Sequence, residues 1–405
     1  MPKRTIDQVD VRGKRVLMRV DFNVPIQDGK ITDDRRIVEA LPSIRSVIDR
    51  GGRLVLISHL GRPDGTGYQP EFSLEPCAHR LTELLGPFVS GGIRFPSHDC
   101  VDGAATAAVN LLADGEGLLL DNLRFHKGES KGDPEFAAKL AAHGDVYCNN
   151  AFGTCHRADA SMVAVPKAMQ GKPRVCGSLV QKEIQYLTDH LEHPAHPFVV
   201  VLGGAKVSDK LPAVAHLIPK ADDVIIGGAM AYTFLKAQGV EVGISRVEAD
   251  KIEDARSTLA LASEGECTIH LPIDHMCSTT FDEHSGEHKA FDGPIGAGYM
   301  GLDIGPKTRE KFAQVIAKAR TIVWNGPMGV FERSLYAVGT RQVAEAIAEA
   351  TSRGAISIVG GGDSAAAAEQ FGVASRLTHV STGGGASLAL LSGEKFPSVE
   401  LLDDE

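Results

Sequence analysis

The sequence lacks the features that would place it in a membrane, outside the cell or on a nucleic acid. It has no uncharged apolar stretch long enough to cross a membrane, and its first residues, Met1 to Asp7, contain no apolar segment of the signal-peptide type. It also has no excess of basic residues, because 42 Lys and Arg against 52 Asp and Glu give a formal net charge of −10. Nucleic-acid binding usually shows as clustered positive charge. We therefore expect no membrane or nucleic-acid partner, and any basic site must be local.

Paired cysteines are missing as well. The seven cysteines are odd in number and form no CxxC pair, which favours free thiols in a reducing compartment over a disulfide or zinc framework. The sequence therefore predicts a cytoplasmic protein. The chain has 405 residues, of which 43% are hydrophobic. It exceeds the size at which one hydrophobic core stops growing, so we expect two domains.

Short apolar segments alternate with amphipathic segments along the whole chain. This alternation is typical of βαβ units, in which helices cover both faces of a parallel sheet. Strands are predicted near residues 15–20, 53–58, 117–121 and 145–148, and in the second half near 197–202, 223–227, 267–272, 321–324, 355–359 and 377–381. Helices are predicted at 134–142, 307–319, 342–350 and 364–370. The predicted fold class is α/β, with two doubly wound, Rossmann-like parallel-sheet lobes.

The boundary between the lobes is predicted at residues 177–193. Leu179, Ile184, Leu187 and Leu191 recur there at near-helical spacing, and two prolines follow at positions 194 and 197. We expect domains at 1–176 and 194–390, with a stiff helix between them. Residues 278–306 hold clustered Gly, Pro and Asp. They are expected to form loops, which either contact a ligand or only decorate the surface.

The residues that follow the predicted strands differ between the two halves. In the first half they are polar or basic: Asp21 to Asn23, Ser58 to Arg62, Asn122 to His126, and His156 with Arg157. In the second half they are glycines: Gly203 and Gly204, Gly227 and Gly228, Gly326, Gly360 to Gly362, and Gly383 to Gly385. Glycine corners let backbone N–H groups approach phosphates at helix N-termini. The first half therefore predicts a site for a small charged anion, and the second half a nucleotide site.

Four arginines of the first half lie in or beside these motifs, with two histidines nearby: Arg36, Arg62, Arg124, Arg157, His59 and His126. Taken singly, each arginine is more often a surface ion-pair partner, and each histidine a satisfied polar side chain. The carboxyl ends of parallel strands converge in space, however, so these groups can meet in one crevice. Together they suit bidentate binding of carboxylate and phosphate oxygens.

The loop Val359 to Ala365 lies between an apolar strand and an Ala-rich helix. It fits the dinucleotide fingerprint GxGxxA loosely, but no acid follows between Glu369 and Glu394 to hold a ribose hydroxyl. Asp363 would repel a bare pyrophosphate, which favours a divalent cation between them and hence Mg²⁺ with a nucleotide. The alternative is a tight turn in which Asp363 only caps the helix.

Gly203 to Lys210 is expected to open another helix, with Lys206 and Lys210 one turn apart on the same face. Two ammonium groups on one face repel each other unless an anion bridges them. A solvated lysine pair is the commoner arrangement, but the preceding glycine pair favours a phosphate. The P-loop pattern GxxxxGK[ST] is absent.

In this order the motifs resemble those of the phosphoglycerate kinase family. Arg15 to Pro25, with the sequence RVLMRVDFNVP, looks like the family's signature. It is followed by Ser58 to Pro63, Leu123 to His126, Asn150 to Arg157, Gly203 to Lys210, Leu302 to Pro306, Asn325 to Glu332, Gly360 to Ser364 and Ser381 to Ser387. The resemblance spans essentially the whole chain. It implies two lobes joined by a helix, a C-terminal tail at 391–405 that returns to the first lobe, and conversion of 1,3-bisphosphoglycerate and ADP to 3-phosphoglycerate and ATP.

The resemblance also implies roles for individual residues. Phosphoglycerate would be bound by Asp21, Phe22, Asn23, Arg36, His59, Leu60, Gly61, Arg62, Arg124 and Arg157. The nucleotide would be bound by Lys206, Lys210, Asn325, Glu332, Gly361, Gly362, Asp363 and Ser364, with Asp363 near Mg²⁺. Transfer would be assisted by Arg36, Lys206, Gly362 and Gly385. The chain departs from the family's usual residues at Asp121, Cys155 and Asp159, where Glu, Ala and His are common.

Phosphoryl transfer depends on positioning and on cationic stabilisation more than on covalent chemistry. Hinge closure would bring the substrates of the two lobes in line and exclude water. No general base is needed, because the carboxylate of 3-phosphoglycerate is ionised at neutral pH. Two other interpretations are a nicotinamide-dependent dehydrogenase, which the missing ribose acid disfavours, and a two-lobed anion-binding protein, which the lysine pair beside a glycine corner disfavours. We expect a monomer.

Overall fold

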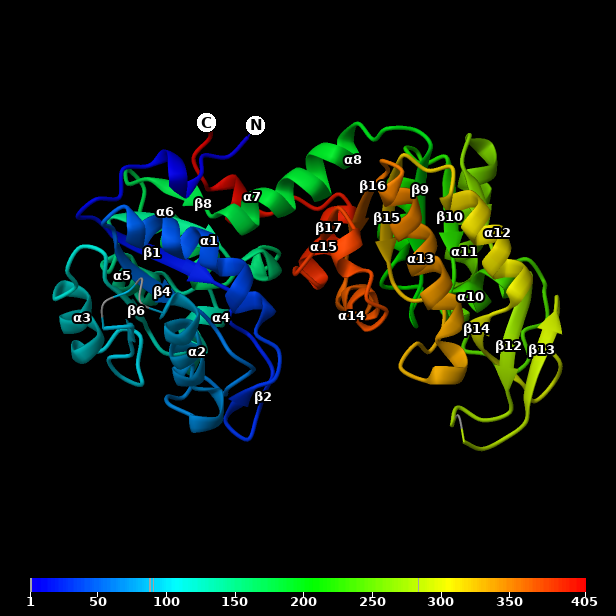
Figure 1. The fold of residues 1–405 in the computed structure, drawn as a ribbon, viewed down its shortest axis with the longest axis horizontal. Helices are drawn as coiled ribbons and strands as arrows, with labels where there is room; N and C mark the ends of the chain where they lie inside the picture. The colour runs from blue at the N-terminus through cyan, green and yellow to red at the C-terminus, as the bar shows by residue number, and fades with distance from the viewer. Residues whose placement is uncertain (1, 87–88, 90, 283) are drawn as a thin grey trace. The chain divides into compact units, whose positions relative to one another are not determined.

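The computed structural model describes residues 2–86, 89, 91–282 and 284–405. They form two compact units: unit 1 comprises Met1–Gln185 and Lys395–Glu405, and unit 2 comprises Tyr186–Glu394 (Figure 1). Each unit contains a six-stranded sheet, so the predicted α/β class with two parallel-sheet lobes is confirmed. Among the described residues, no helix is both long and apolar enough to cross a membrane.

The sheet of unit 1 is parallel throughout, in the order β5-β6-β4-β1-β7-β8. Its strands are β1 (Arg15–Val20), β4 (Arg53–Ile57), β5 (Ile93–Arg94), β6 (Gly117–Leu119), β7 (Val146–Asn150) and β8 (Arg174–Cys176). Helices α1 (Arg35–Asp49), α2 (Glu75–Leu85), α3 (Gly103–Asn110), α5 (Pro134–Ala141) and α7 (Ser178–Ile184) belong to the same unit. The strands are almost entirely buried, which is why they read as continuous apolar runs.

Local signals fix where several helices begin. Asp102 caps α3 by accepting a hydrogen bond from the N–H of Ala105 (2.6 Å). Asp133 caps α5 in the same way through Phe136 (2.8 Å), and Pro134 occupies the first turn. A capping carboxylate satisfies an N–H group that has no partner inside the helix.

The C-terminal tail belongs to unit 1. Arg174 forms an ion pair with Asp403 (3.0 Å), and the Ser398 hydroxyl donates to the Cys155 carbonyl (2.7 Å). Residues up to Glu394 remain with unit 2; Gly393 packs there so closely against His216 that a Cβ would lie 2.7 Å from its ring. The tail therefore starts at Lys395, four residues later than the 391 predicted from the sequence.

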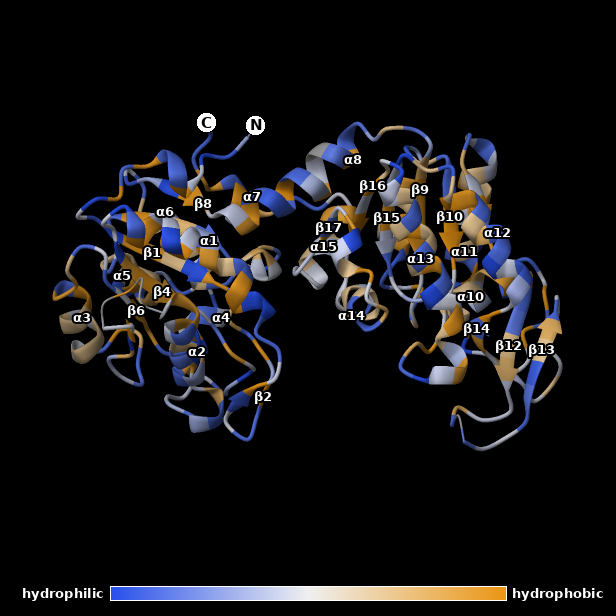
Figure 2. Cartoon of the chain, in the orientation of Figure 1, coloured by the Kyte–Doolittle hydropathy of each residue, from blue (hydrophilic) through white to orange (hydrophobic). Residues whose placement is uncertain are grey.

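The main sheet of unit 2 is also parallel, in the order β11-β10-β9-β15-β16-β17. Its strands are β9 (Phe198–Leu202), β10 (Asp223–Ile226), β11 (Thr268–His270), β15 (Thr321–Asn325), β16 (Ile356–Val359) and β17 (His379–Val380). The helices are α9 (Leu211–Leu217), α10 (Met230–Ala237), α11 (Ile252–Glu264), α12 (Pro306–Ile316), α13 (Val338–Ser352), α14 (Gly362–Gln370) and α15 (Gly385–Leu391). Figure 2 shows hydrophobic residues concentrated on the strands of both units.

A second sheet in unit 2 includes part of the predicted loop region at 278–306. Strands β12 (Asp274–Ser278), β13 (His288–Asp292) and β14 (Met300–Ile304) pair antiparallel in the order β13-β12-β14. β13 was not predicted from the sequence because this strand is largely exposed and carries polar residues. The expectation of loops is therefore wrong for residues 288–292 and 300–304, which form β13 and β14.

The segment predicted as a connecting helix is helical from Ser178 to Glu192. It consists of α7, a π-helical turn at Gln185–Asp189 and α8 (His190–Glu192). The division between the units falls inside it, between Gln185 and Tyr186.

Candidate functional site

The polar motifs of unit 1 follow the carboxyl ends of β1, β4, β6 and β7, which are adjacent in the sheet. Arg36, at the second position of α1, donates through Nη1 to the Asp21 carboxylate at 2.8 Å. His59, which follows β4, places its Nδ1 4.0 Å from the other oxygen of Asp21. Two strand ends and a helix start thus meet at one carboxylate. We name Arg19, Arg36, Arg124, Arg157 and His59 the arginine cluster.

Arg19 is the member of the cluster that the sequence reasoning missed. It lies inside β1 and is fully buried. Its guanidinium donates to His59 Nδ1 (3.0 Å) and to the Ser161 hydroxyl (2.9 Å), and Ser161 in turn donates to buried Glu129 (2.6 Å). The sequence could have indicated Arg19, because it lies in an otherwise apolar strand and a buried charge needs a partner.

The electrostatics of His59 show how closely the arginines gather. Burial lowers the pKa of His59 well below its ordinary value, and the charges of Arg19, Arg124, Arg157 and Arg36 lower it further. A positive charge on the imidazole would be repelled by all four guanidinium groups. His59 is therefore a neutral imidazole at neutral pH, and the cluster derives its positive charge from arginine alone.

Two arginines of the cluster hold buried donors without a partner in the described chain. These are the Nε atoms of Arg124 and Arg157. Arg124 is partly engaged, because Nη1 donates to the Gly61 carbonyl (2.8 Å) and Nη2 lies 3.5 Å from the Asp159 carboxylate. Buried donors are normally satisfied, so the two Nε groups favour an external acceptor. A small oxyanion supplies such acceptors.

The other residues predicted to bind phosphoglycerate differ in whether their polar groups are already bonded within the chain. Phe22 is a core residue, and its N–H donates to the Ser58 hydroxyl (2.9 Å). Asn23 accepts from the N–H of Gly61 (2.9 Å), and the Leu60 carbonyl accepts from Asn122 (2.7 Å). These contacts shape the loop after β4 and hold it to the loop after β1. Arg62 is exposed, and among the described residues no hydrogen bond or ion pair links it to the arginine cluster.

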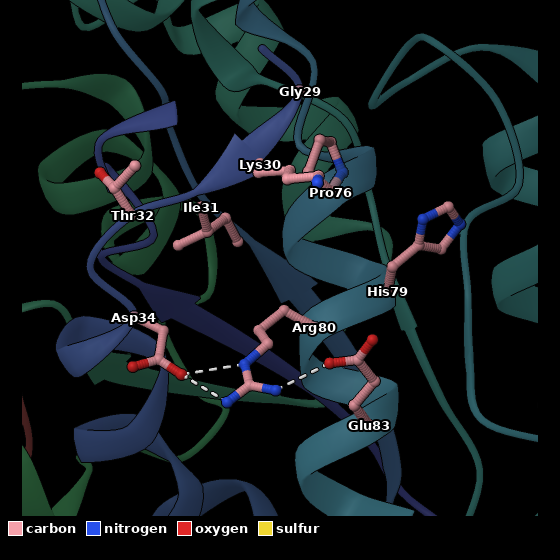
Figure 3. Close-up of a pocket in the computed structure, with 9 residues that line it drawn as sticks. All are labelled: Gly29, Lys30, Ile31, Thr32, Asp34, Pro76, His79, Arg80 and Glu83. Carbon is pink, nitrogen blue, oxygen red and sulfur yellow. Dashed lines mark hydrogen bonds and ion pairs between the residues drawn. The ribbon is translucent and has the colours of Figure 1, made fainter. Parts of the chain in front are cut away.

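A pocket of about 520 Å³ lies in unit 1 beside the start of α1 (Figure 3). Arg80 of α2 donates to Asp34 through Nε (2.9 Å) and forms an ion pair with Glu83 (2.7 Å). Asp34 is the N-cap residue of α1 but makes no capping hydrogen bond, since its carboxylate faces Arg80 instead. Arg80 therefore holds the start of the helix that carries Arg36.

Unit 2 contains a pocket of about 610 Å³ beside the glycine corners after β9, β10 and β15. Its walls are partly apolar, with Tyr232, Met300, Leu302 and Val330. Charged side chains of the same lining are Arg246, Glu332, Arg333 and Asp363. An apolar slot with a few charged groups suits a flat heterocycle that carries a polar tail.

The glycine corners are needed for close packing of the chain. A Cβ on Gly203 would lie 2.1 Å from the Pro327 carbonyl oxygen, and one on Gly228 would lie 2.5 Å from the Gly204 nitrogen. The N–H of Gly204 donates to Pro327 and that of Gly228 to Met328, at 2.9 and 3.0 Å. The expectation that these two N–H groups face a phosphate is therefore wrong. They hold the floor of the pocket together.

The predicted lysine pair is not on a helix. α9 begins only at Leu211, and Lys206 and Lys210 lie in the turns before it. Lys206 is exposed, whereas Lys210 is half-buried and donates to the Asn325 side chain. The turn is held by Glu248, which accepts from Ser208 N–H (3.1 Å) and hydroxyl (2.8 Å). The expected common helical face is thus wrong, because this carboxylate delays the start of the helix.

The loop after β16 keeps Asp363 available. Gly361 is the N-cap residue of α14, with φ of 92°, and the structure shows no side-chain cap. Asp363 lies exposed in the first turn of α14 and lines the pocket, so the interpretation as a helix cap is wrong. Ser364 is buried, and its hydroxyl accepts from the N–H of Gly326.

The two remaining glycines predicted to assist transfer open helices. Gly362 is the first residue of α14, and Gly385 is the first residue of α15. Both are exposed. The first N–H groups of a helix have no partner within it, and they carry partial positive charge.

Known proteins resemble this chain over its full length. The sequence model described as phosphoglycerate kinase matches residues 6–394. The phosphoglycerate kinase of Rhodopirellula baltica is 56% identical over 407 residues, with 100% of both chains covered. That of Thermosipho africanus is 51% identical over 98% of this chain and 97% of its own. Among solved structures, phosphoglycerate kinase from Coxiella burnetii superposes with a TM-score of 0.88 at 36% identity, covering 99% of this chain and 98% of that one.

The two parallel-sheet units, with an arginine cluster in one and a glycine-cornered pocket in the other, are those of a two-domain kinase, that is, a phosphotransferase. The particular family follows from the family model, which matches nearly the whole chain, and from relatives that share about half of their residues with it. This chain belongs to the phosphoglycerate kinase family.

Proposed function

We propose that the arginine cluster binds 3-phosphoglycerate and the acyl-phosphate end of 1,3-bisphosphoglycerate. The observation that carries this proposal is the pair of buried, unpartnered Nε groups on Arg124 and Arg157, beside an imidazole that the cluster keeps neutral. Guanidinium groups bind carboxylate and phosphate oxygens in a bidentate manner. Asp21 and Asn23 order the loops around the anion, and exposed Arg62 would reach it from the rim.

The pocket of unit 2 is proposed to bind ADP or ATP. Its apolar walls would contact the base, and Glu332 would accept hydrogen bonds from ribose hydroxyls. Lys210 would face the phosphates; burial lowers the pKa of this ammonium, while the charge of Asp363 acts to raise it, so the two side chains lie near each other. Lys210 also orients Asn325, and Ser364 and Gly361 fix the loop that presents Asp363.

Mg²⁺ fits the residues of this pocket. Asp363 is an exposed carboxylate that caps no helix, and Mg²⁺ is commonly held by one or two carboxylates together with substrate phosphates. When bound, Mg²⁺ would neutralise phosphate charge and orient the transferred group.

The chain's own contribution to transfer is proposed to be positive charge and orientation. Arg36 would stabilise the phosphoryl group from unit 1, and Lys206 with the helix starts at Gly362 and Gly385 would do so from unit 2. No residue needs to act as a base, because the attacking carboxylate is already ionised and the nearest imidazole, His59, is held by Arg19. With one substrate in each unit, transfer requires a closed conformation. We also propose a cytoplasmic monomer, which fits seven free and buried cysteines.

Calorimetric titration of 3-phosphoglycerate and MgADP, separately and together, tests these assignments. Arg157→Ala should weaken 3-phosphoglycerate binding about 10- to 100-fold, as expected for lost hydrogen bonds to a charged group, and should leave MgADP unchanged. Glu332→Ala should weaken MgADP alone. Arg94→Ala is the matched control, because Arg94 pairs with Glu116 at the surface. Equal effects of both variants on both ligands would contradict the assignment of one site to each unit.

A further inference from the structure

A cluster of three possible metal ligands lies in unit 1, apart from the arginine cluster. Asp99 and Cys100 precede α3, and His126 follows β6. One carboxylate oxygen, the thiol sulfur and one imidazole nitrogen all lie within 4.8 Å of one another. His126 Nε2 is 3.1 Å from Asp99 Oδ1. The sequence had suggested that His126 supports the anion site, but the structure directs this imidazole to Asp99.

The distances suit a small divalent cation. Zinc binds sulfur at about 2.3 Å and nitrogen or oxygen at about 2.0–2.2 Å, so the ligand atoms of a tetrahedral site lie about 3.3–3.7 Å apart. The Nε2–Oδ1 distance of 3.1 Å is slightly shorter than this spacing. No two of the three ligand atoms lie more than 4.8 Å apart, so shifts of about 1 Å would bring them to tetrahedral spacing. The donor set of one thiolate, one imidazole and one carboxylate selects a thiophilic ion such as Zn²⁺ over Mg²⁺.

The surroundings of Cys100 add a second, independent observation. Cys100 is fully buried, yet its sulfur makes no hydrogen bond to another described residue. Three carboxyl groups, those of Asp99, Glu129 and Asp121, act electrostatically on this sulfur. Acidic side chains around a buried position attract a cation, and a bound cation makes the thiolate stable.

Access to the cluster is one-sided. The side chain of Asp99 is 37% exposed and that of His126 is 29% exposed, whereas Cys100 forms the buried end. An ion can therefore enter past the carboxylate and the imidazole. The same side leaves room for water as a fourth ligand, as in zinc sites with three protein ligands.

We propose that Asp99, Cys100 and His126 form a binding site for one thiophilic divalent cation, with Zn²⁺ as the preferred ion. Binding forms one bond each to sulfur, nitrogen and oxygen. The thiol proton is released to solvent, and the imidazole binds through an unprotonated Nε2 with its proton on Nδ1; no electron is transferred. The ion would tie the segment before α3 to the start of α4 (Lys127–Ser130), two residues beyond Arg124. This site is separate from the Mg²⁺ proposed at Asp363 in unit 2.

The test is a Zn²⁺ titration of metal-free protein in competition with a chromophoric chelator, with excess Mg²⁺ present throughout. The wild type should bind one Zn²⁺ that Mg²⁺ does not displace. Co²⁺ in its place should give the sulfur-to-metal absorption band of a thiolate complex. Cys100→Ser should remove this band and weaken Zn²⁺ binding at least about 10-fold, and His126→Gln should weaken binding to a similar degree.

Cys148→Ser is the matched control. Cys148 is also a fully buried free thiol, but its neighbourhood lacks a comparable cluster in the described chain, so this variant should retain Zn²⁺ and the Co²⁺ band. Asp99→Asn, at a partly exposed position, provides a further variant should Cys100→Ser unfold. Unchanged affinity in both Cys100→Ser and Asp99→Asn, or no stoichiometric Zn²⁺ in the wild type, would overturn the proposal.

Discussion

His275 offers a quantitative test of the electrostatics inside unit 2. It lies on β12, only 1% exposed, and its Nδ1 has no partner in the described chain. Burial lowers its pKa from 6.5 to about 4. Below pH 6.5, His275 therefore takes up a proton in the unfolded chain but not in the folded chain. The free energy of unfolding falls as the pH falls. For these pKa values, proton linkage gives a loss of about 2 kcal/mol between pH 7 and pH 5.

The measurement is urea unfolding at pH 7 and pH 5, followed by tryptophan fluorescence. Trp324 is the only tryptophan of the chain, and it is fully buried in unit 2. Comparison with His275→Asn is needed, because burial also raises the pKa of Asp303 to about 7. In the folded state that carboxyl takes up a proton as the pH falls through about 7, whereas in the unfolded chain it stays ionised down to pH 5. The protein therefore gains stability from Asp303 on acidification, which opposes the histidine. The variant should lose about 2 kcal/mol less than the wild type between the two pH values. Equal pH dependence in both proteins would refute the reasoning.

Three further predictions concern the proposed reaction. Arg36→Ala should lower kcat by on the order of 10³-fold while changing 3-phosphoglycerate affinity far less, as expected for a charge that acts in the transition state; a near-normal kcat in steady-state assays would remove Arg36 from that role. Asp363→Asn should raise the Mg²⁺ concentration needed for half-maximal activity and leave 3-phosphoglycerate binding unchanged, which an unaltered Mg²⁺ dependence would contradict. His59→Gln should raise KM more than it lowers kcat. The kcat of the wild type should stay nearly constant from about pH 6 to 8, because the lowered pKa favours the neutral form of His59. A steep loss of kcat at acidic pH that this variant abolishes would show that His59 acts as a base.

The main sheets were predictable because buried parallel strands consist of short runs of apolar residues. β1 spans Arg15–Val20 as predicted, and β9 begins one residue later than predicted, at Phe198. β5 and β8 escaped prediction because they are short and each contains an arginine, whereas the equally short β6 lies in the apolar run Leu118 to Leu120. Residues so few carry no periodicity, and their pairing is set by the neighbouring strands of the sheet.

The site was predictable where a motif ends a strand, and less so where distant residues meet. Arg36 and Asp21 are close because α1 starts beside the end of β1. Arg19 was missed because its partners, Ser161 and His59, lie 142 and 40 residues away in the sequence. The turn before α9 was predicted wrongly for the same reason, since its N–H groups are taken by Glu248 from another part of unit 2.

The arginine cluster shows why binding and stability should be linked in unit 1. Gathering four guanidinium groups around a neutral imidazole is unfavourable for folding, and Asp21 and Asp159 compensate only in part. Arg124 shows the cost directly, because burial lowers the pKa of its guanidinium more than the charge of Asp159 restores it. An oxyanion that occupies the two free Nε groups relieves both the repulsion and the missing hydrogen bonds. The repulsion within the cluster would then be a source of binding energy, and a bound oxyanion would stabilise unit 1 in proportion to the logarithm of its concentration over Kd.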